Sequence, residues 1–526
     1  MNDTQLKRPR PTRSSQLALL ASLVLGCGLI VASVIQAAVG RAGQLPSAIG
    51  QPLTEVAAVS FPNCRFGAGG AISSAYAITS LNLGWYMDWG TQLNPARPNS
   101  AEYVQVVRLS PADGGYTFTP GLPVLYQIAD QNPGAVWLIG NEPDSQFQDE
   151  LPPETYAQAY HDLYGWLKQH DPSAQIGAGS IVQPTPLRLQ YLDRVLTAYR
   201  QLSGQLMPVD VWSIHSYILR EIDTSDPQAC LDGNCTEPPY EIWGAFIPTG
   251  MLSTATRGEL YSLSKTLDAA IFRQRLIDFR SWLKNRGYRD TPVYITEFGT
   301  LLPYWPYVSD PFYDELGQEM TEARSIAFMQ QAFNVLLTAT DAAVGQPADG
   351  NRLVQRWLWY SLDDTRHFGG ALFNPQTGQR TALGNAWASY VQAITPTVDL
   401  LAVRVVAEPA AVKDTGAPQT TTLKATVSNQ GNSAITQPIT VAFYAGVPPT
   451  GSLIGVQTVS KTVLAGCAAT ADVTITWHNL GPGLHPMYAQ IDPSATVPET
   501  DRSNNQAAGQ FLVAAHQVYL PVIPKN

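Results

Sequence analysis

The feature that most constrains the fold is an apolar run, Val136–Ile139, that stops abruptly at Gly140-Asn141-Glu142-Pro143. A continuous run of this kind is typical of a parallel strand that is buried on both faces. Pro143 cannot continue a strand ladder, so the strand ends here. The sequence therefore places Glu142 at the carboxyl end of a buried strand. Taken alone, the run is equally well explained as a strand-end turn with an exposed glutamate.

A second run of the same character leads to Glu297. Pro292–Phe298 is short and rich in β-formers, and Gly299 lets the chain turn after it. Hydrolysis of a glycosidic bond needs two carboxyl groups, one to protonate the leaving oxygen and one to attack the sugar or activate water. The two groups hold different protonation states only where their environments differ. Glu142 and Glu297 are therefore a candidate two-carboxylate site.

Strands alternate with helices between residues 61 and 393, which is typical of a parallel sheet with covering helices. Eight strands are expected, near residues 64–67, 81–86, 103–109, 136–139, 175–181, 209–217, 292–298 and 356–360. Amphipathic helices are expected near residues 156–167, 187–202, 272–283, 326–337 and 385–393. The order predicts an α/β fold, a (β/α)8 TIM barrel with loop insertions, and both glutamates lie at its carboxyl-terminal face, where active sites of this fold occur.

The character of the chain changes after a short linker at residues 394–397. Residues 398–514 contain β-rich runs punctuated by Gly, Asn and Pro, without an amphipathic helix. This pattern predicts a smaller all-β, immunoglobulin-like sandwich. We expect it to be a separate folding unit that hydrolysis of small substrates does not need. The tail, 515–526, is apolar in part but too short to span a membrane.

The N-terminus, residues 1–40, has the character of a signal peptide or a membrane anchor, followed by a spacer at 41–60. Basic residues up to Arg13 precede an uncharged stretch from Leu17 to Ile35, which is just long enough to span a bilayer. The basic flank predicts export of the rest of the chain, and hence an extracellular or cell-surface location. Cleavage after Ala37, retention as an anchor and acylation at Cys27 all remain open.

Composition limits the partners and cofactors. The net charge is −10 and no basic tract lies beyond the N-terminal tail, which argues against nucleic acid. No Cys/His cluster has metal-ligand spacing, so we expect neither a metal nor another cofactor. Cys230 and Cys235 are disulfide candidates in an exported protein, with two free thiols as the alternative. Cys64 and Cys467 are interpreted as single buried cysteines.

The barrel resembles the clan of retaining glycoside hydrolases built on TIM barrels that is often called clan A. The resemblance is carried by Asn141-Glu142 after strand four and Glu297 after strand seven, and it covers residues 60–393. It implies that Glu142 is the acid/base, that Glu297 is the nucleophile and that Asn141 binds the sugar 2-hydroxyl. The implied substrate is a polysaccharide or oligosaccharide with a β-linkage.

The same resemblance implies further substrate-binding residues. His215 and Tyr217 match a site position after strand six, and Trp359, rather than Trp357, matches a sugar-stacking tryptophan after strand eight. The clan usually supplies an arginine from strand two; this chain has none there, and Arg108 of strand three is the substitute. The plainer interpretation of His215 and Trp359 is a satisfied core histidine and barrel filling.

Aromatic residues lie in several of the loops that should surround the cleft. The set comprises Trp85, Trp89, Trp243, Tyr304 and Trp305. Sugar faces pack on aromatic rings, and platforms on three loops suit a long ligand, so we expect an endo-acting enzyme on a β-glucan, xylan or mannan. Ordinary packing is the simpler explanation for each tryptophan.

The C-terminal domain resembles the bacterial cell-adhesion-related module called CARDB. The resemblance is carried by Asn429-Gln430-Gly431, Leu464-Ala465-Gly466, Trp477 and Ile491-Asp492. It implies a spacer or adhesion module, and hence attachment to a cell surface or cell wall. The rival hypothesis for the whole chain is a non-catalytic carbohydrate-binding or adhesion protein on a degenerate barrel. The presence of both glutamates with Asn141 argues against it, because a binding protein does not need this acid pair.

Overall fold

The computed structural model describes residues 63–146, 148–222, 244–248, 250–251, 261–301, 313–364, 369–460 and 464–514. Several predictions fall outside these residues: the N-terminal segment, the Cys230–Cys235 disulfide, and the aromatic side chains of Trp243, Tyr304 and Trp305. Within the described part of the chain, no helix is both long and apolar enough to cross a membrane.

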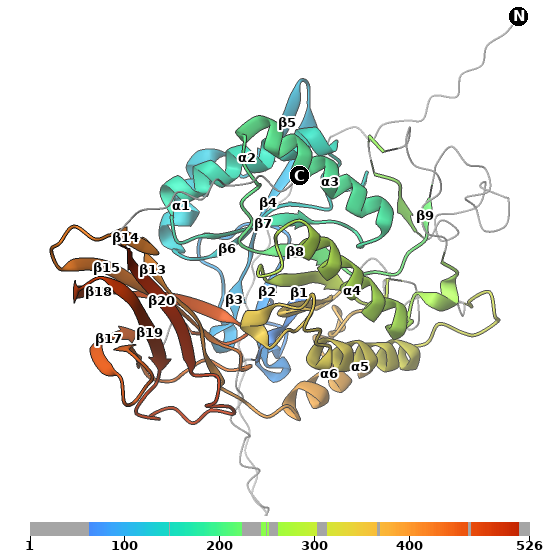
Figure 1. Cartoon of the computed structure of the whole chain (residues 1–526). Helices are drawn as coiled ribbons and strands as arrows, with labels where there is room; N and C mark the ends of the chain where they lie inside the picture. The colour runs from blue at the N-terminus through green and yellow to red at the C-terminus, as the bar shows by residue number, and fades with distance from the viewer. Residues whose placement is uncertain are drawn as a thin grey trace, which may run out of the picture. The chain divides into compact units, whose positions relative to one another are not determined.

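The α/β domain is built on the eight strands that the sequence predicts, in the predicted order (Figure 1). They are β1 (Asn63–Gly69), β2 (Leu83–Met87), β3 with β4 (Glu102–Tyr103 and Gln105–Ala112), β6 (Val136–Asn141), β7 (Gln175–Ser180), β8 (Trp212–His215), β11 (Val293–Phe298) and β12 (Arg356–Tyr360). A six-stranded sheet has the order β3-β2-β1-β12-β11-β8. A four-stranded sheet has the order β5-β4-β6-β7, in which β5 (Gly115–Thr119) forms an unpredicted antiparallel hairpin with β4.

The two sheets adjoin at two places. Only Val104 separates β3 from β4 in the chain, and its backbone N–H donates to Tyr86. Near β7 and β8, isolated parallel bridges join Gly177 with Val211 and Ile181 with Ile214. The pairings establish a mixed α/β domain with a curled parallel sheet. Closure into a complete (β/α)8 barrel stays a prediction.

Helices follow the strands from β4 onward. They are α1 (Leu122–Gln131), α2 (Pro153–His170), α3 (Pro186–Ser203), α4 (Ala269–Asn285), α5 (Glu322–Thr338) and α6 (Ala382–Gln392). Only short 3-10 helices, Ile78–Leu81 and Pro98–Ser100, follow β1 and β2. Asp268, Thr321 and Thr381 cap α4, α5 and α6 with their side-chain oxygens, which explains where these helices begin.

Side chains of one strand alternate between two apolar layers. On β6, Trp137 and Ile139 belong to the large core packed against the helices. Val136 and Leu138 belong to a second cluster, made with residues of β2, β4, β11 and β12 such as Trp85. The strand is therefore buried on both faces, as its continuous apolar sequence predicts.

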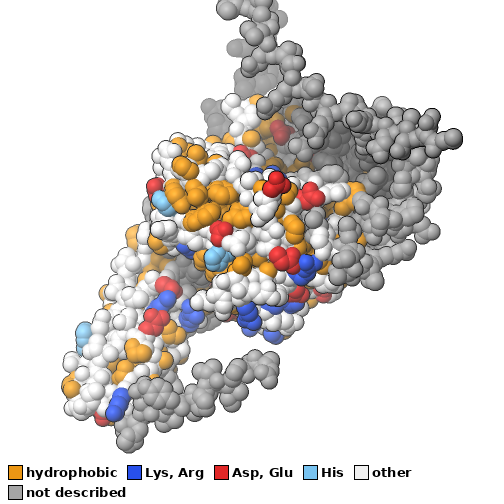
Figure 2. Space-filling view, turned by 90° about the horizontal axis from the view of Figure 1, so that it is seen from above, with side chains coloured by type: hydrophobic (Ala, Val, Ile, Leu, Met, Phe, Trp, Pro, Cys, Tyr) orange, Lys and Arg blue, Asp and Glu red, His pale blue; other side chains and the backbone are white. Residues whose placement is uncertain are grey.

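The C-terminal domain is a separate all-β unit with its own core. Its strands are β13 (Leu400–Glu408), β14 (Ala411–Lys413), β15 (Gln419–Asn429), β16 (Ile439–Ala445), β17 (Ser452–Val459), β18 (Ala469–Leu480), β19 (Gly483–Ile491) and β20 (Gln506–Ala514). They form a three-stranded sheet, β13-β15-β18, and a five-stranded sheet, β14-β20-β19-β16-β17. Among the described residues on the face seen in Figure 2, acidic and basic side chains are interspersed.

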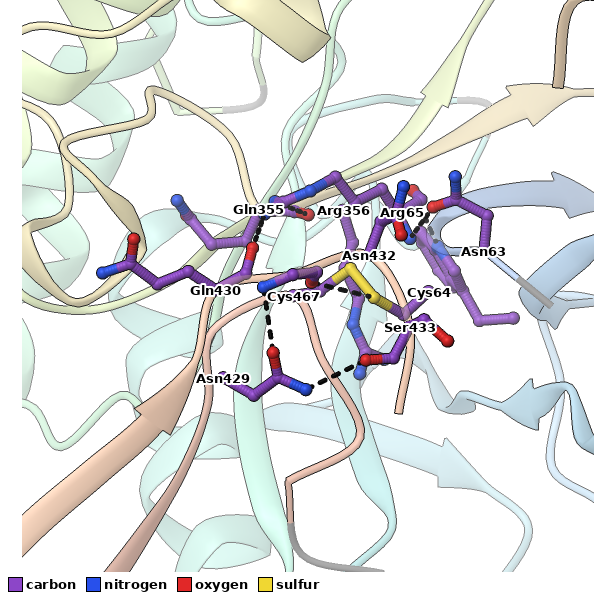
Figure 3. Close-up of a disulfide and its surroundings, with 12 residues drawn as sticks. Asn63, Cys64, Arg65, Gln355, Arg356, Asn429, Gln430, Asn432, Ser433 and Cys467 are labelled. Atoms are coloured by element: carbon purple, nitrogen blue, oxygen red, sulfur yellow. Dashed lines mark hydrogen bonds between the residues drawn. A yellow bond between two sulfur atoms is a disulfide. The ribbon is translucent and has the colours of Figure 1, made fainter. Parts of the chain in front are cut away.

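The interpretation of Cys64 and Cys467 as single cysteines is wrong. They form a disulfide that joins β1 to the turn before β18, across 403 positions of sequence (Figure 3). The backbone N–H of Cys64 also donates to Asn432 of the C-terminal domain, at 3.2 Å. The pairing depends on which segments the fold brings together, so the spacing of the cysteines could not reveal it.

Hydrogen bonds also attach the linker between the domains to the C-terminal domain. The side chain of Asn432 accepts from the backbone N–H of Thr397 at 2.8 Å and donates to the carbonyl oxygen of Thr395 at 3.0 Å. The C-terminal domain therefore holds both the first strand of the α/β domain and the segment that follows its last helix. Whether hydrolysis can proceed without residues 398–514 stays a prediction.

Candidate functional site

The first side chain of the site is Glu142, directly after β6. Its backbone has φ of +47°, in the left-handed region that a residue with a Cβ rarely adopts. The backbone N–H donates to Ser180 at the end of β7 at 2.8 Å, and the carbonyl oxygen accepts from Ser145 at 3.0 Å. A tight turn, pinned to the neighbouring strand, thus presents a carboxylate of which 12% is exposed.

The second side chain is Glu297, near the end of β11. It pairs with His215 of β8, where the register of the two strands shifts after Ile295. Both of its carboxylate oxygens accept hydrogen bonds: Oε1 from Trp89 Nε1 at 2.5 Å and Oε2 from Tyr217 Oη at 2.9 Å. Donors on both oxygens favour the ionised form of a carboxylate.

His215 lies between the two glutamates and is completely buried. Its Nδ1 is 2.8 Å from Glu142 Oε1, and its Nε2 is 3.3 Å from Glu297 Oε1. The nearest oxygen of each carboxylate and a ring nitrogen all lie within 4.8 Å of one another. The fold therefore brings together three predicted site residues from β6, β8 and β11.

The proximity of these groups shifts their pKa values. Burial raises the pKa of Glu297 to about 7; the charge on Glu142 adds to the rise, while His215 and the Tyr217 and Trp89 donors oppose it. Burial alone would lower the pKa of His215, but the carboxylates of Glu297 and Glu142 outweigh it and raise that pKa. Burial and the Glu297 charge raise the pKa of Tyr217 well above its usual value, so Tyr217 remains a donor.

Glu142, His215 and Glu297 could also hold a metal ion. Imidazole and carboxylate ligands suit several divalent transition metals. In this site each imidazole nitrogen already faces one carboxylate, so a bound cation would replace the proton between them. Trp89 and Tyr217 offer only N–H and O–H hydrogens to Glu297, which favours a proton-based site over a metal-based one.

Trp89 is a site residue that the sequence analysis interpreted chiefly as packing. Its backbone has φ of +58°, and the preceding Asp88 accepts from Tyr103 and, at 2.6 Å, from Gln92. The indole ring lies 5.4 Å from the ring of Tyr360, centroid to centroid. The signal available in the sequence was its position directly after the second strand, in the aromatic run that begins at Trp85.

Asn141 and Arg108 meet next to the Glu142 turn. The buried carboxylate of Asp149 accepts from the backbone N–H of Asn141 at 2.7 Å and from Arg108 Nε at 2.7 Å. Gln148 Oε1 accepts from Arg108 at 2.9 Å and lies 3.4 Å from Asn141 Nδ2. Arg108 is thus engaged with Asp149 rather than with Glu297, and its contact with substrate stays a prediction, as does that of Asn141.

The structure corrects two of the predicted sugar platforms. Trp359 is completely buried; its ring packs on Phe298 and Phe333, and its Nε1 donates to Gly370 at 2.7 Å. Trp85 is also completely buried, in the inner apolar cluster. Neither ring has a free face on which a sugar could stack, so both serve as packing, as large aromatic side chains commonly do.

Comparison with known proteins supports the assignment of the C-terminal domain. Residues 399–509 match the family model described as CARDB, which confirms the predicted module. No curated protein matches the chain.

Solved structures show similarity to both parts of the chain. A GH128 (subgroup II) endo-β-1,3-glucanase from Sorangium cellulosum has 16% identity and a TM-score of 0.36, over 62% of this chain and 98% of that one. The endo-β-1,3-glucanase of the same subgroup from Pseudomonas viridiflava has 15% identity and a TM-score of 0.38, over 62% and 98%. A CARDB domain from Pyrococcus furiosus, in complex with di-metal ions, has 23% identity and a TM-score of 0.19, over 22% and 90%.

Proposed function

We propose that the chain is an exported glycoside hydrolase that cleaves β-glycosidic bonds of a polysaccharide by a retaining mechanism, on a closed (β/α)8 barrel. The observation that carries the proposal is that Glu142 and Glu297, from separate strands, bring carboxylate oxygens within 4.8 Å of each other. Retaining enzymes place their carboxyl groups about 5–5.5 Å apart, whereas inverting enzymes leave about 6.5–9.5 Å for a water. The isolated bridges near β7 and β8 support closure of the barrel.

The hydrogen bonds support distinct roles for the two glutamates. Glu297, which accepts from Trp89 and Tyr217, attacks the anomeric carbon while the bond to the leaving oxygen breaks. Glu142, whose partner is His215, gives its proton to that oxygen and then takes a proton from water. The water attacks the anomeric carbon and displaces Glu297, which restores both groups.

His215 would make this close approach of two acids tolerable. Two carboxylates that share a site repel each other, and an imidazolium between them compensates one negative charge. The two carboxylates raise the pKa of His215 against the effect of burial, which favours the protonated form of the ring. The histidine would thus offset part of the negative charge that Glu142 and Glu297 bring to one site.

Two further observations support the substrate class and the location. Trp89 and Tyr360 are partly exposed, their rings lie 5.4 Å apart and Trp89 contacts Glu297, so they could carry the face of a sugar in an endo-acting cleft. The disulfide suits an oxidising, extracellular compartment. The CARDB domain suits a cell-surface protein.

Azide rescue tests the mechanism. The purified chain is first incubated with a panel of β-glucans, xylans and mannans, and its products are followed with time. On the polysaccharide that is cleaved, Glu297→Ala should be inactive and should form the inverted glycosyl azide when azide is added. Glu142→Ala should instead give the glycosyl azide with retained configuration on an activated aryl glycoside.

Each outcome has a definite consequence. Exchange of the two azide products between the variants would reverse the roles, and inversion by the wild-type enzyme would overturn the retaining mechanism. Binding to a glycan without any product would favour the non-catalytic alternative.

A further inference from the structure

A completely buried arginine, Arg188, lies next to the turn that carries Glu142. It is the third residue of α3, and its Nη1 donates to the carboxylate of Asp144. The same Nη1 lies 3.3 Å from the backbone oxygen of Asp144. Asp144 is itself completely buried and also faces the backbone N–H of Val182 at 3.3 Å. A buried ion pair therefore anchors the turn two residues after Glu142.

The other two arms of the guanidinium reach a different part of the chain. Nε donates to Glu221 Oε1 at 3.1 Å, and Nη2 donates to the backbone oxygen of Phe246 at 2.7 Å. Glu221 lies in β9 (Glu221–Ile222) and Phe246 in β10 (Ala245–Phe246), two short strands that pair in parallel. Thr185, the residue before α3, donates to the same Glu221 oxygen at 2.5 Å. One side chain thus joins the Glu142 turn to the β9–β10 pair.

We propose that Arg188 is a positioning residue for Glu142, an inference that rests on the function proposed above. It holds the Glu142 turn and the β9–β10 pair in one arrangement, so that the carboxyl of Glu142 reaches the leaving oxygen of the substrate. The left-handed backbone of Glu142 needs such support, because unusual backbone conformations persist only where their surroundings hold them.

The chemistry of the guanidinium explains why arginine suits position 188 better than lysine or an apolar residue. Its planar group offers five N–H donors in fixed directions, which match two carboxylates and two backbone oxygens. A lysine keeps the charge but cannot reach all these partners at once. An apolar side chain would remove the guanidinium from the buried carboxylates of Asp144 and Glu221, and the loss of one partner of a buried ion pair is strongly unfavourable.

The test uses the dependence on the leaving group. A 2,4-dinitrophenyl glycoside has a leaving group that needs no proton, whereas a phenyl glycoside of the same oligosaccharide depends on the general acid. Arg188→Met should lower kcat/KM for the phenyl glycoside by about 100-fold, the size of effect expected for a misplaced catalytic group. The loss for the dinitrophenyl glycoside should be less than about tenfold, and Arg188→Lys should restore part of the phenyl activity.

Arg280→Met is the matched control. Arg280 is also completely buried, on α4, and its guanidinium donates to the backbone oxygens of Leu353 and Thr291, away from the site. This variant should lose stability without a change in the ratio of the two activities. Each protein is checked for its unfolding midpoint before the kinetics.

The outcomes separate this inference from the proposed function. Equal losses on the two glycosides in Arg188→Met would overturn the positioning role and leave Arg188 as a structural residue. Failure of the folded wild-type protein to cleave either glycoside would instead overturn the proposed function. If Arg188→Met does not fold, Arg188→Lys and Asp144→Asn take its place, and the same ratio of activities decides.

Discussion

The two ends of the parallel sheet use charge in opposite ways. At the amino ends of the strands, Arg65 of β1 donates to both oxygens of Asp349, at 2.8 and 2.9 Å. Its remaining donors reach the backbone oxygens of Gln355 and, in the CARDB domain, Gln430. This end therefore places a buried cation directly on a buried carboxylate, and the disulfide at Cys64 reinforces it.

At the carboxyl ends, the same sheet gathers charges that oppose one another. Glu142 and Glu297 converge on one histidine, and the turn of Glu142 has a left-handed backbone. Such an arrangement is unfavourable for folding and favourable for acid–base chemistry. In the barrel proposed above, such a difference is expected, because α/β barrels have one face that supplies stability and one that supplies function.

The largest expected effect is on activity. If the proposed mechanism holds, Glu297→Gln should lower kcat/KM by about 10⁴-fold or more, because the variant lacks the proposed covalent nucleophile. Glu102→Gln is the control, since Glu102 pairs with Arg356 at the amino ends of the strands. Steady-state kinetics on the cleaved polysaccharide measure both variants. A comparable loss of kcat/KM in the control would contradict the idea that activity depends on the carboxyl ends of the strands and not on the amino ends.

The next effect is on stability. Arg65→Met should lower the free energy of unfolding by about 3–5 kcal/mol, because it removes the nearer cation of the buried Asp349 and leaves only Arg352, at 3.9 Å. Activity per folded molecule should be retained. Denaturant unfolding measures the change, and Arg404→Met, on an exposed face of β13, provides a control. An unchanged midpoint would show that the amino end does not depend on this pair.

Removal of the disulfide should have a somewhat smaller effect. The double variant Cys64→Ser, Cys467→Ser should be less stable by about 2–4 kcal/mol, because the crosslink no longer restricts the unfolded chain. The thermal midpoint should fall more in the wild type than in the variant on reduction with dithiothreitol, since the variant retains only Cys230 and Cys235 as a candidate pair. Equal thermal midpoints for the oxidised wild type and the variant would show that stability does not depend on the Cys64–Cys467 disulfide.

The smallest effect concerns pH. Folding raises the pKa of Glu297 from its usual 4.5 to about 7, mainly through burial. Between these values the folded protein holds a proton that the unfolded chain has released, so this group's contribution to stability falls as pH rises from about 4.5 to about 7. The glutamine in Glu297→Gln cannot titrate. The thermal midpoint of this variant minus that of the wild type should therefore increase as pH rises through this window. A constant difference between the midpoints would contradict the shifted pKa.

Local pattern was sufficient for most elements of the fold, although helix α1 was not predicted. The apolar runs that end at Asn141 and Phe298 predicted β6 and β11, because burial on both faces requires a continuous apolar strand. The change to β-rich sequence after residue 397 likewise predicted the C-terminal domain. The hairpin strand β5 was missed, because Gly115–Thr119 is short and partly exposed and gives a weak periodic signal.

The sequence by itself determined that two glutamates lie at the carboxyl ends of buried strands, since strand burial and strand ends are properties of neighbouring residues. Only the tertiary structure decided that His215 lies between them, that Trp89 donates to Glu297 and that Arg188 joins Asp144 to Glu221. It also decided that Trp359 is packed on both sides and that Cys64 pairs with Cys467. These features are distances between segments remote in sequence, and the packing of the whole chain sets such distances, not the residues beside each one.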